Sequence, residues 1–215
     1  MVDRTVDPDW VEPTDAELDA AATAIIEGCP PSRLSADCLA CFFATSPDTL
    51  ENTKLSFLFS YWQKHTDPQT GRQNRAEFDM LTLLPAVGNI MILDVLRDGF
   101  DARYRLYGTG VAAHAGRDWT GERVSDMNRV TRNNLALMYR AIYLAAYRAR
   151  RPIYSLHRSP DWVSAKCWRR VVLPMTYEGE VCSQFIVGNI PVDPFNLSRE
   201  DQARQQARVR KKTTE

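Results

Sequence analysis

The sequence lacks an apolar run long enough to cross a membrane, which takes roughly 20 predominantly apolar residues. Its first ten residues, MVDRTVDPDW, carry acidic side chains and no apolar segment of the secretory type. Neither sign of charge is in excess, because Lys plus Arg and Asp plus Glu each number 27. The overall charge therefore gives no argument for a nucleic acid or an anionic membrane as partner, and we expect a cytoplasmic protein without a membrane span.

Cysteine is scarce and odd in number: there are five, which without a secretory signal favours reduced thiols over a disulfide framework. Cys38 and Cys41, with Cys29 nearby, have a spacing that suits one zinc ion or a reactive pair. A structural zinc site needs four ligands, and no second cysteine pair or histidine cluster lies close in sequence. We therefore expect buried thiols that pack as small hydrophobic side chains, and no metal site.

What is present fits one globular domain with an extension, since the 215 residues are 44% hydrophobic and 25% charged. Thr14 and Glu17 form a capping box before apolar residues at helical spacing, which predicts a short helix in an N-terminal extension, residues 1–48. A second short helix is expected over residues 33–45. At the other end, residues 193–215 are expected to be a polar tail.

Ser46, Pro47 and Asp48 predict the start of a further helix, within a segment of flanking helix and linker, residues 49–88. Near the end of that segment a short helix is expected over residues 77–87. The flanking helix carries an apolar stripe, which we predict to be a dimer or docking face, because two-fold pairing is the commonest assembly. The stripe is formed by Leu55, Leu58, Phe59 and Trp62.

Two short strands, 90–96 and 102–108, are predicted as a hairpin, because β-favouring runs flank an Asp-Gly pair. In the second strand a period of two places Tyr104 and Leu106 on the core side and Tyr107 on the wetter side. Glycines break the regularity after this strand, which suits short helical turns that cross over a sheet.

A long helix is predicted over residues 131–151, because apolar residues step by three and four and a proline ends the run. Three strands are expected after it, over residues 153–158, 165–177 and 180–190. The last two should form a hairpin. The order of elements predicts an α+β core over residues 89–192, with one covered face of its sheet.

Five short motifs accompany this order of elements: Tyr61-Trp62, Leu93-Asp94-Val95, Arg103-Tyr104-Arg105-Leu106 with Gly108-Thr109, Gly116-Arg117-Asp118 with Thr120-Gly121, and Val171-Val172-Leu173-Pro174. Together with the order of elements they resemble a PAS domain, in which helices pack on one face of a five-stranded antiparallel sheet. More narrowly, the chain is similar to small stand-alone bacterial PAS proteins, best known from alphaproteobacteria, over roughly residues 50 to 192. The resemblance implies a sensory or interaction module that regulates signalling and binds a small ligand, a protein partner or a second copy of itself.

The resemblance also implies that a ligand, when present, lies between the long helix and the inner face of the sheet. A small apolar or aromatic ligand would suit the side chains expected there. The same side chains also suit ordinary core packing, because aromatic and aliphatic stripes at these periods normally pack. The cavity candidates are Ile92, Tyr104, Leu106, His114, Trp119, Tyr139, Tyr143, Phe185 and Val187.

Haem and a light-sensing flavin are disfavoured as cofactors. PAS domains that bind haem commonly use a histidine on or beside the long helix, and residues 131–151 contain none, although His114 lies in the connection near the expected cavity. PAS photosensors that bind flavin carry a reactive cysteine in an Asn-Cys-Arg setting, and there is no cysteine between Cys41 and Cys167.

Two features suggest an anion site. The first is the group of Gly108, Gly110 and Gly116, but the sequence around them does not contain the Gly-Lys-Ser/Thr motif of a phosphate-binding loop. We therefore interpret them as turn glycines. Three arginines near the hairpin could receive an anion or a partner's carboxylates, but ion pairing on a solvated sheet face is the commoner role. These arginines are Arg103, Arg105 and Arg117.

An alternative from another class is a small enzyme whose pocket holds His157, Asp161 and Cys167. Their spacing matches no catalytic template, so we expect no catalytic residues. A third alternative is contact with nucleic acid through a basic tail, which the neutral core does not complement, and we expect none. The basic residues of the tail are Arg204, Arg208, Arg210, Lys211 and Lys212.

Overall fold

The computed structural model of the protein describes residues 11–28, 37–67, 79–132, 135–160, 163–176 and 182–192. Within these residues the helices are α1 (Asp15–Ile26), α2 (Thr53–Lys64), α3 (Thr109–Ala115), α4 (Val124–Thr131) and α5 (Leu135–Ala149), with short 3-10 helices η1 (Pro47–Leu50) and η3 (Leu84–Ala86). The strands are β1 (Cys38–Phe43), β2 (Ile90–Leu96), β3 (Asp101–Tyr107), β4 (Ile153–Arg158), β5 (Cys167–Met175) and β6 (Gln184–Val192).

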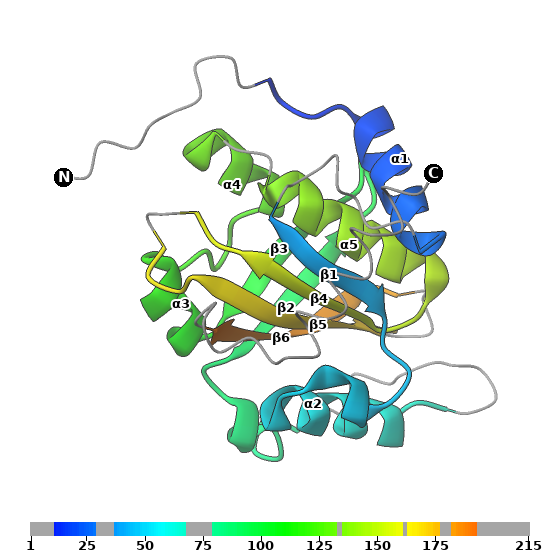
Figure 1. Cartoon of the computed structure of the whole chain (residues 1–215), viewed down its shortest axis with the longest axis vertical. Coiled ribbons are helices and arrows are strands. Elements are labelled where there is room, and N and C mark those ends of the chain that lie inside the picture. Colours follow the sequence, from blue (N-terminus) through cyan, green and yellow to red (C-terminus); the bar gives the residue numbers. More distant parts are fainter. Residues whose placement is uncertain are drawn as a thin grey trace, which may run out of the picture.

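The strands form one sheet in the order β1-β4-β5-β6-β2-β3, and every neighbouring pair is antiparallel. Figure 1 shows α4 and α5 over one face, which we call the inner face, and α2 against the opposite, outer face. The predicted α+β class is confirmed, and the segment expected as the core, residues 89–192, contains β2 to β6 with α3, α4 and α5. The sheet has six strands because β1 adds to the edge of β4.

The prediction of a helix over residues 33–45 is wrong, because residues 38–43 form β1. This strand pairs with β4 from Cys38 opposite His157 to Phe43 opposite Ile153. The pairing satisfies backbone groups that would otherwise lie open at the edge of β4, so the tertiary context overrides the local preference of the segment.

The predicted hairpin is confirmed, with β2 at the predicted bounds and β3 displaced by one residue. The alternation along β3 is not as predicted, because the register between β2 and β3 shifts at a β-bulge. Arg105 is the extra residue of this bulge and has no residue of β2 directly opposite it. As a result Tyr107 returns to the inner face and is 7% exposed, whereas Leu106 is 37% exposed. The prediction that Leu106 lines a cavity is therefore wrong.

The N-terminal capping box is confirmed. The Thr14 hydroxyl accepts a hydrogen bond from the Glu17 backbone at 3.2 Å, and the Glu17 carboxylate accepts one from the Thr14 backbone at 2.8 Å. The apolar stripe of α1, which includes Ala22 and Ile25, is buried in the same hydrophobic cluster as α5. Helix α1 therefore packs against α5, as Figure 1 shows.

The predicted start of the flanking helix at Ser46 is wrong, because residues 47–50 form the 3-10 helix η1. Glu51 has a φ of 50°, which interrupts the helical path. The helix α2 begins after Asn52, whose side-chain oxygen accepts from the backbone N–H of Lys54 and Leu55 at 3.0 and 3.2 Å. Of the short helix expected over residues 77–87, only η3 forms within the described part.

The sheet separates two hydrophobic clusters, one on each face. The outer cluster lies between the sheet and α2, and it contains Leu55, Leu58 and Phe59 at 0%, 1% and 3% exposure. Trp62 packs against it and donates its indole N–H to the Pro174 carbonyl at 2.8 Å. The predicted docking stripe is therefore covered by the protein's own sheet, and the prediction that it binds a partner is wrong for this conformation.

The later elements follow the prediction closely. β4 has the predicted bounds, and β5 lies inside its predicted range. The long helix is α5, which begins at Leu135, while Thr131 ends α4. Among the described residues no helix combines the length and apolarity that a membrane crossing requires.

Candidate ligand site beneath α5

An arginine lies inside the inner core, beneath α5. Arg170 occupies the middle of β5 and is 3% exposed. Its Nε donates to Asn189 Oδ1 at 3.2 Å, and its Nη1 donates to the Tyr143 hydroxyl at 3.4 Å. The guanidinium also lies 3.9 Å from the centre of the Tyr139 ring. A full positive charge is thus held in the core by neutral partners.

Two other buried arginines each have a carboxylate within ion-pair distance. Arg140, 7% exposed, lies 3.6 Å from the Asp101 carboxylate, and Arg169, 8% exposed, lies 3.5 Å from the Glu51 carboxylate. Among the described residues Arg170 has no carboxylate within ion-pair distance. Because a buried charge without a counter-charge costs several kcal/mol, about as much as several ordinary hydrogen bonds, this site is costly to keep.

The tyrosines around Arg170 are protonated at physiological pH. Burial is the largest cause that raises the pKa of Tyr104, Tyr107, Tyr139 and Tyr143 above the usual value, and the charge of Arg170 partly opposes it. An arginine stays charged at any physiological pH. The site therefore combines one permanent cation with neutral hydroxyl groups.

His157 lies beside this group on β4. Its Nε2 is 2.7 Å from the Tyr139 hydroxyl, and its Nδ1 has no hydrogen-bond partner among the described residues. Burial, and then the charge of Arg170, lower the pKa of His157 well below its usual value. The imidazole is therefore neutral at neutral pH.

The catalytic alternative does not fit this arrangement. His157 is paired with Trp168 across the strands, so the neighbouring Cys167 projects to the other face, where it belongs to the outer cluster. Histidine and thiol are thus separated by the sheet, because consecutive residues of a strand alternate. Asp161 lies outside the described residues.

A small cavity of about 50 Å³ lies next to Arg170. At roughly 10–15 Å³ for each water, this is the space of about three to five waters, well below the several hundred Å³ typical of sites for large cofactors. Its floor is the sheet and its roof comes from α4, α5 and the loop before β5. The lining residues are Tyr107, Ala115, Trp119, Met127, Thr131, Leu135, Tyr139, Pro160, Val163, Trp168, Arg170 and Asn189.

The predicted cavity residues take different places. Two of them, Trp119 and Tyr139, line the cavity. His114 lies on α3 and forms an edge-to-face pair with Trp168, with 6.3 Å between the ring centres. Ile92 belongs to the outer cluster, so its prediction as a cavity residue is wrong. Four other predicted cavity residues, Tyr104, Tyr143, Phe185 and Val187, belong to the inner cluster but do not line the cavity.

The residues that define the site, Arg170 and Asn189, were not predicted from the sequence. A signal was available, since Arg169 and Arg170 stand side by side within an apolar run that was predicted as a strand. Adjacent residues of a strand point to opposite faces of the sheet. If both faces are covered, both arginines are buried. Tyr107 was missed because the extra residue Arg105 reversed its direction.

The other two anion features are occupied by the chain itself. A Cβ at Gly108 would meet the Ile90 carbonyl oxygen at 2.6 Å and the Gly88 carbonyl oxygen closer still, so the glycine serves a close backbone approach and carbonyl oxygens fill the space. Arg105 pairs with Asp94 at 3.0 Å, and Arg117 pairs with Glu122. Ion pairing is therefore the role of both arginines.

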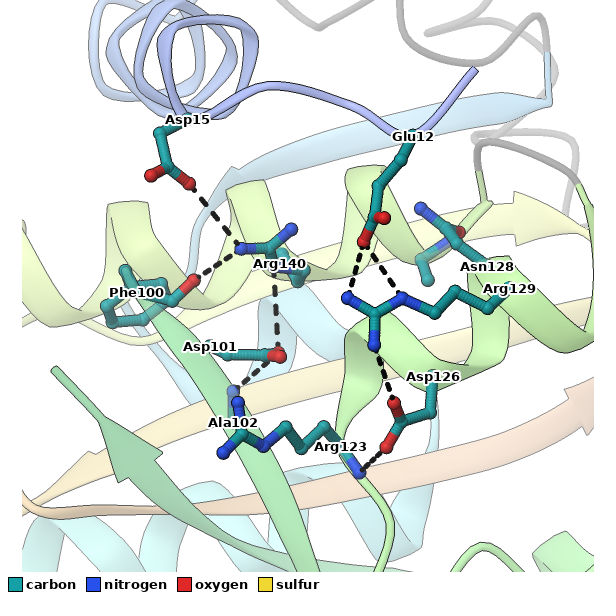
Figure 2. A network of polar contacts seen from close by, with 11 residues as sticks. Glu12, Asp15, Phe100, Asp101, Ala102, Arg123, Asp126, Asn128, Arg129 and Arg140 are labelled. Carbon is teal, nitrogen blue, oxygen red and sulfur yellow. Dashed lines mark hydrogen bonds and ion pairs between the residues drawn. The ribbon is translucent and has the colours of Figure 1, made fainter. Parts of the chain in front are cut away.

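A polar network ties the N-terminal segment to the core (Figure 2). Arg129 of α4 contacts Glu12 at 2.7 Å, and Arg140 of α5 contacts the Phe100 carbonyl at 2.8 Å and Asp15 at 4.0 Å. Arg129 is largely exposed, and exposed ion pairs contribute about 0–1 kcal/mol. The apolar stripe of α1 is therefore the main attachment of residues 11–28 to the core.

No family model and no curated protein matches the chain. A solved structure titled "Structure of an RNA-binding Light-Oxygen-Voltage Receptor" is similar, with a TM-score of 0.44 and 11% sequence identity over 93% of this chain. The chain spans 64% of that protein's length. This similarity is too low to carry a functional argument, so function is argued from the site.

Proposed function

We propose that this protein is a non-catalytic sensory or interaction module of the PAS type, which binds a small ligand between α5 and the sheet. One observation carries the proposal. Arg170 is 97% buried, borders a cavity, and has no carboxylate partner among the described residues. Such a charge is typical of a binding site rather than of a stability element, because the unpaired charge opposes folding.

The non-catalytic part of the proposal is supported by the neighbouring groups. His157 is neutral, fully buried and hydrogen-bonded to Tyr139, and Cys167 faces the other side of the sheet. Within the described residues no group of three His, Cys, Asp or Glu side chains is arranged to hold a metal ion. These residues offer no activated nucleophile and base within reach of each other.

The route from ligand to signal follows from the roof of the cavity. Met127 of α4 and Leu135 of α5 both line it, and α1 packs on the far side of α5. A ligand that favours one arrangement of α4 and α5 therefore changes the support beneath α1. We propose that this shift in population alters the surface that α1 presents to a protein partner or a second copy.

The test is native mass spectrometry of the freshly purified protein, followed by thermal unfolding against a panel of small metabolites. Ala115 lines the cavity, so Ala115→Leu should fill it and abolish any ligand-dependent rise in Tm. Ala113, exposed on the same helix, provides the matched control, and Ala113→Leu should respond like the natural protein. A ligand effect that survives Ala115→Leu unchanged would place the site elsewhere and contradict the proposal.

A further inference from the structure

The charge of the site points to an anionic ligand. A guanidinium has five N–H groups in a planar fork, and the contacts to Asn189 and Tyr143 use two of them. The same fork binds a carboxylate through two parallel hydrogen bonds. Arg140 and Arg169 receive a carboxylate from the chain itself, at 3.6 and 3.5 Å. No described residue supplies a carboxylate to Arg170.

The distribution of polar groups points to an anion with one polar end. Arg170 and Asn189 lie on the floor of the cavity, on neighbouring strands. The roof contains Met127, Leu135 and Val163, which cannot donate hydrogen bonds. An inorganic oxyanion carries oxygens on every side and would bury some of them against this roof, which is costly. A carboxylate carries both oxygens at one end and an apolar group at the other.

The polar side chains of the roof, Thr131 and Tyr139, are already engaged. The Thr131 hydroxyl donates to the Met127 carbonyl at 2.5 Å, within α4, and the Tyr139 hydroxyl lies 2.7 Å from His157 Nε2. Trp119 and Trp168 add aromatic surface to the lining. The apolar end of a ligand would therefore meet apolar surface on most sides.

The size of the cavity limits the ligand. About 50 Å³ holds roughly four non-hydrogen atoms, on the basis of about 10–15 Å³ for each water-sized group. We infer that the cavity binds a short-chain monocarboxylate, of the size of acetate or propionate, with its carboxylate on Arg170 and its alkyl group under Met127 and Leu135. This inference rests on the proposed function, whose ligand class it names.

The decisive experiment is isothermal titration calorimetry of the full chain at constant ionic strength. The probes are acetate and propionate, their neutral amides acetamide and propionamide, and the inorganic anions nitrate and phosphate. We expect propionate to bind at least tenfold more tightly than propionamide, which has the same shape without the charge. Nitrate and phosphate should bind more weakly than either carboxylate.

Variants of the cation separate charge from shape. Arg170→Met should reduce the affinity for propionate at least tenfold, and Arg170→Lys should give an intermediate loss, because it keeps the charge without the fork. Arg105→Met, which removes an exposed arginine that does not line the cavity, is the control and should bind like the natural protein. Circular dichroism confirms that each variant is folded, and the comparison of acid with amide on the natural protein needs no variant.

The measurements distinguish a failure of the carboxylate inference from a failure of the proposed function. Equal affinity for propionate and propionamide, tighter binding of phosphate than of carboxylates, or retained affinity in folded Arg170→Met would each overturn the carboxylate inference. If instead only larger or neutral metabolites bind, and Ala115→Leu abolishes that binding, the carboxylate inference fails and the proposed function stands. If no small molecule binds at all, both fail.

Discussion

Replacement of Gly188 by alanine tests the packing of α2 on the outer face of the sheet. Gly188 lies in β6, between Ile90 of β2 and Val171 of β5. A Cβ at this position would lie 2.6 Å from Leu55 Cδ2 and 2.7 Å from Leu58 Cδ1. Carbon atoms pack at about 3.5–4.0 Å, so the added methyl group must displace α2 or both leucine side chains.

Two opposing terms set the size of the effect. Overpacking of a well-filled core costs about 1–3 kcal/mol. Alanine is intrinsically better than glycine in a strand interior by roughly 0.5–1 kcal/mol, because it loses less conformational entropy on folding. Because the added Cβ would approach carbons of two buried leucines to less than 3.0 Å, we take the upper part of the overpacking range, about 2–3 kcal/mol, and expect Gly188→Ala to lower the free energy of unfolding by about 1–2.5 kcal/mol, opposite in sign to the intrinsic preference.

Urea denaturation with a double-mutant cycle measures the contact itself. Leu55→Ala alone should cost about 2–5 kcal/mol, because the side chain is fully buried. In the double variant the new methyl group enters the space left by Leu55, so the two losses should fall short of additivity by about 1 kcal/mol. Leu83→Ala is the control, since Leu83 is also fully buried in the outer cluster but is not among the nearest neighbours of the added Cβ. A neutral or stabilising Gly188→Ala, or a strictly additive cycle with Leu55→Ala, would refute the packing described for α2.

Two further predictions concern buried ionisable groups, and both are measured by urea denaturation. Arg140→Met leaves the Asp101 carboxylate, 3% exposed, without its ion-pair partner, and it should lower the free energy of unfolding by about 3–5 kcal/mol. Arg170→Met leaves no carboxylate of the described residues without a partner, so its loss should be smaller by at least about 2 kcal/mol. Equal losses in the two variants would contradict the absence of a carboxylate partner at Arg170. The second concerns His157, whose pKa is lower in the folded protein than in the unfolded chain, so the unfolded chain binds a proton more readily. The stabilising contribution of the neutral imidazole is therefore fully present above the unfolded pKa, near 6.5, and it is lost as the pH falls below that value. Stability should fall by up to about 1.4 kcal/mol per pH unit below that point, and His157→Gln, measured in parallel from about pH 7 to pH 5, should remove this part of the slope; an unchanged slope would show that His157 does not titrate on unfolding.

Features that depend on neighbours in sequence were predictable. The capping box at Thr14 and Glu17, the hairpin of β2 and β3, and strand β4 formed as expected, because caps, turns and periodicities act over a few residues. The start of α2 was missed although the Ser-Pro-Asp signal is strong. Glu51, in a left-handed conformation, ends η1, and Asn52 provides the cap that the helix uses.

Features that depend on distant partners were not predictable. Residues 38–43 became a strand because β4 offers an open edge, and β4 is more than 100 residues away. The stripe of α2 was expected to face a partner, and it faces the sheet. Leu106 and Tyr107 exchanged faces because one extra residue, Arg105, shifted the pairing with β2. In each case the deciding contact joins segments that no local pattern connects.

The sequence by itself determined the α+β class and the order of helices and strands, since hydrophobic periodicity reports the type of each element. It also determined that two arginines stand together in an apolar strand. Only the tertiary structure decided what each arginine meets, because strand alternation sends them to opposite faces that different helices cover. Arg169 lies 3.5 Å from Glu51 on the outer face, and Arg170 lies beneath α5 beside a cavity, with neutral partners. The same residue type is thus a paired structural charge at one position and a candidate ligand site at the next.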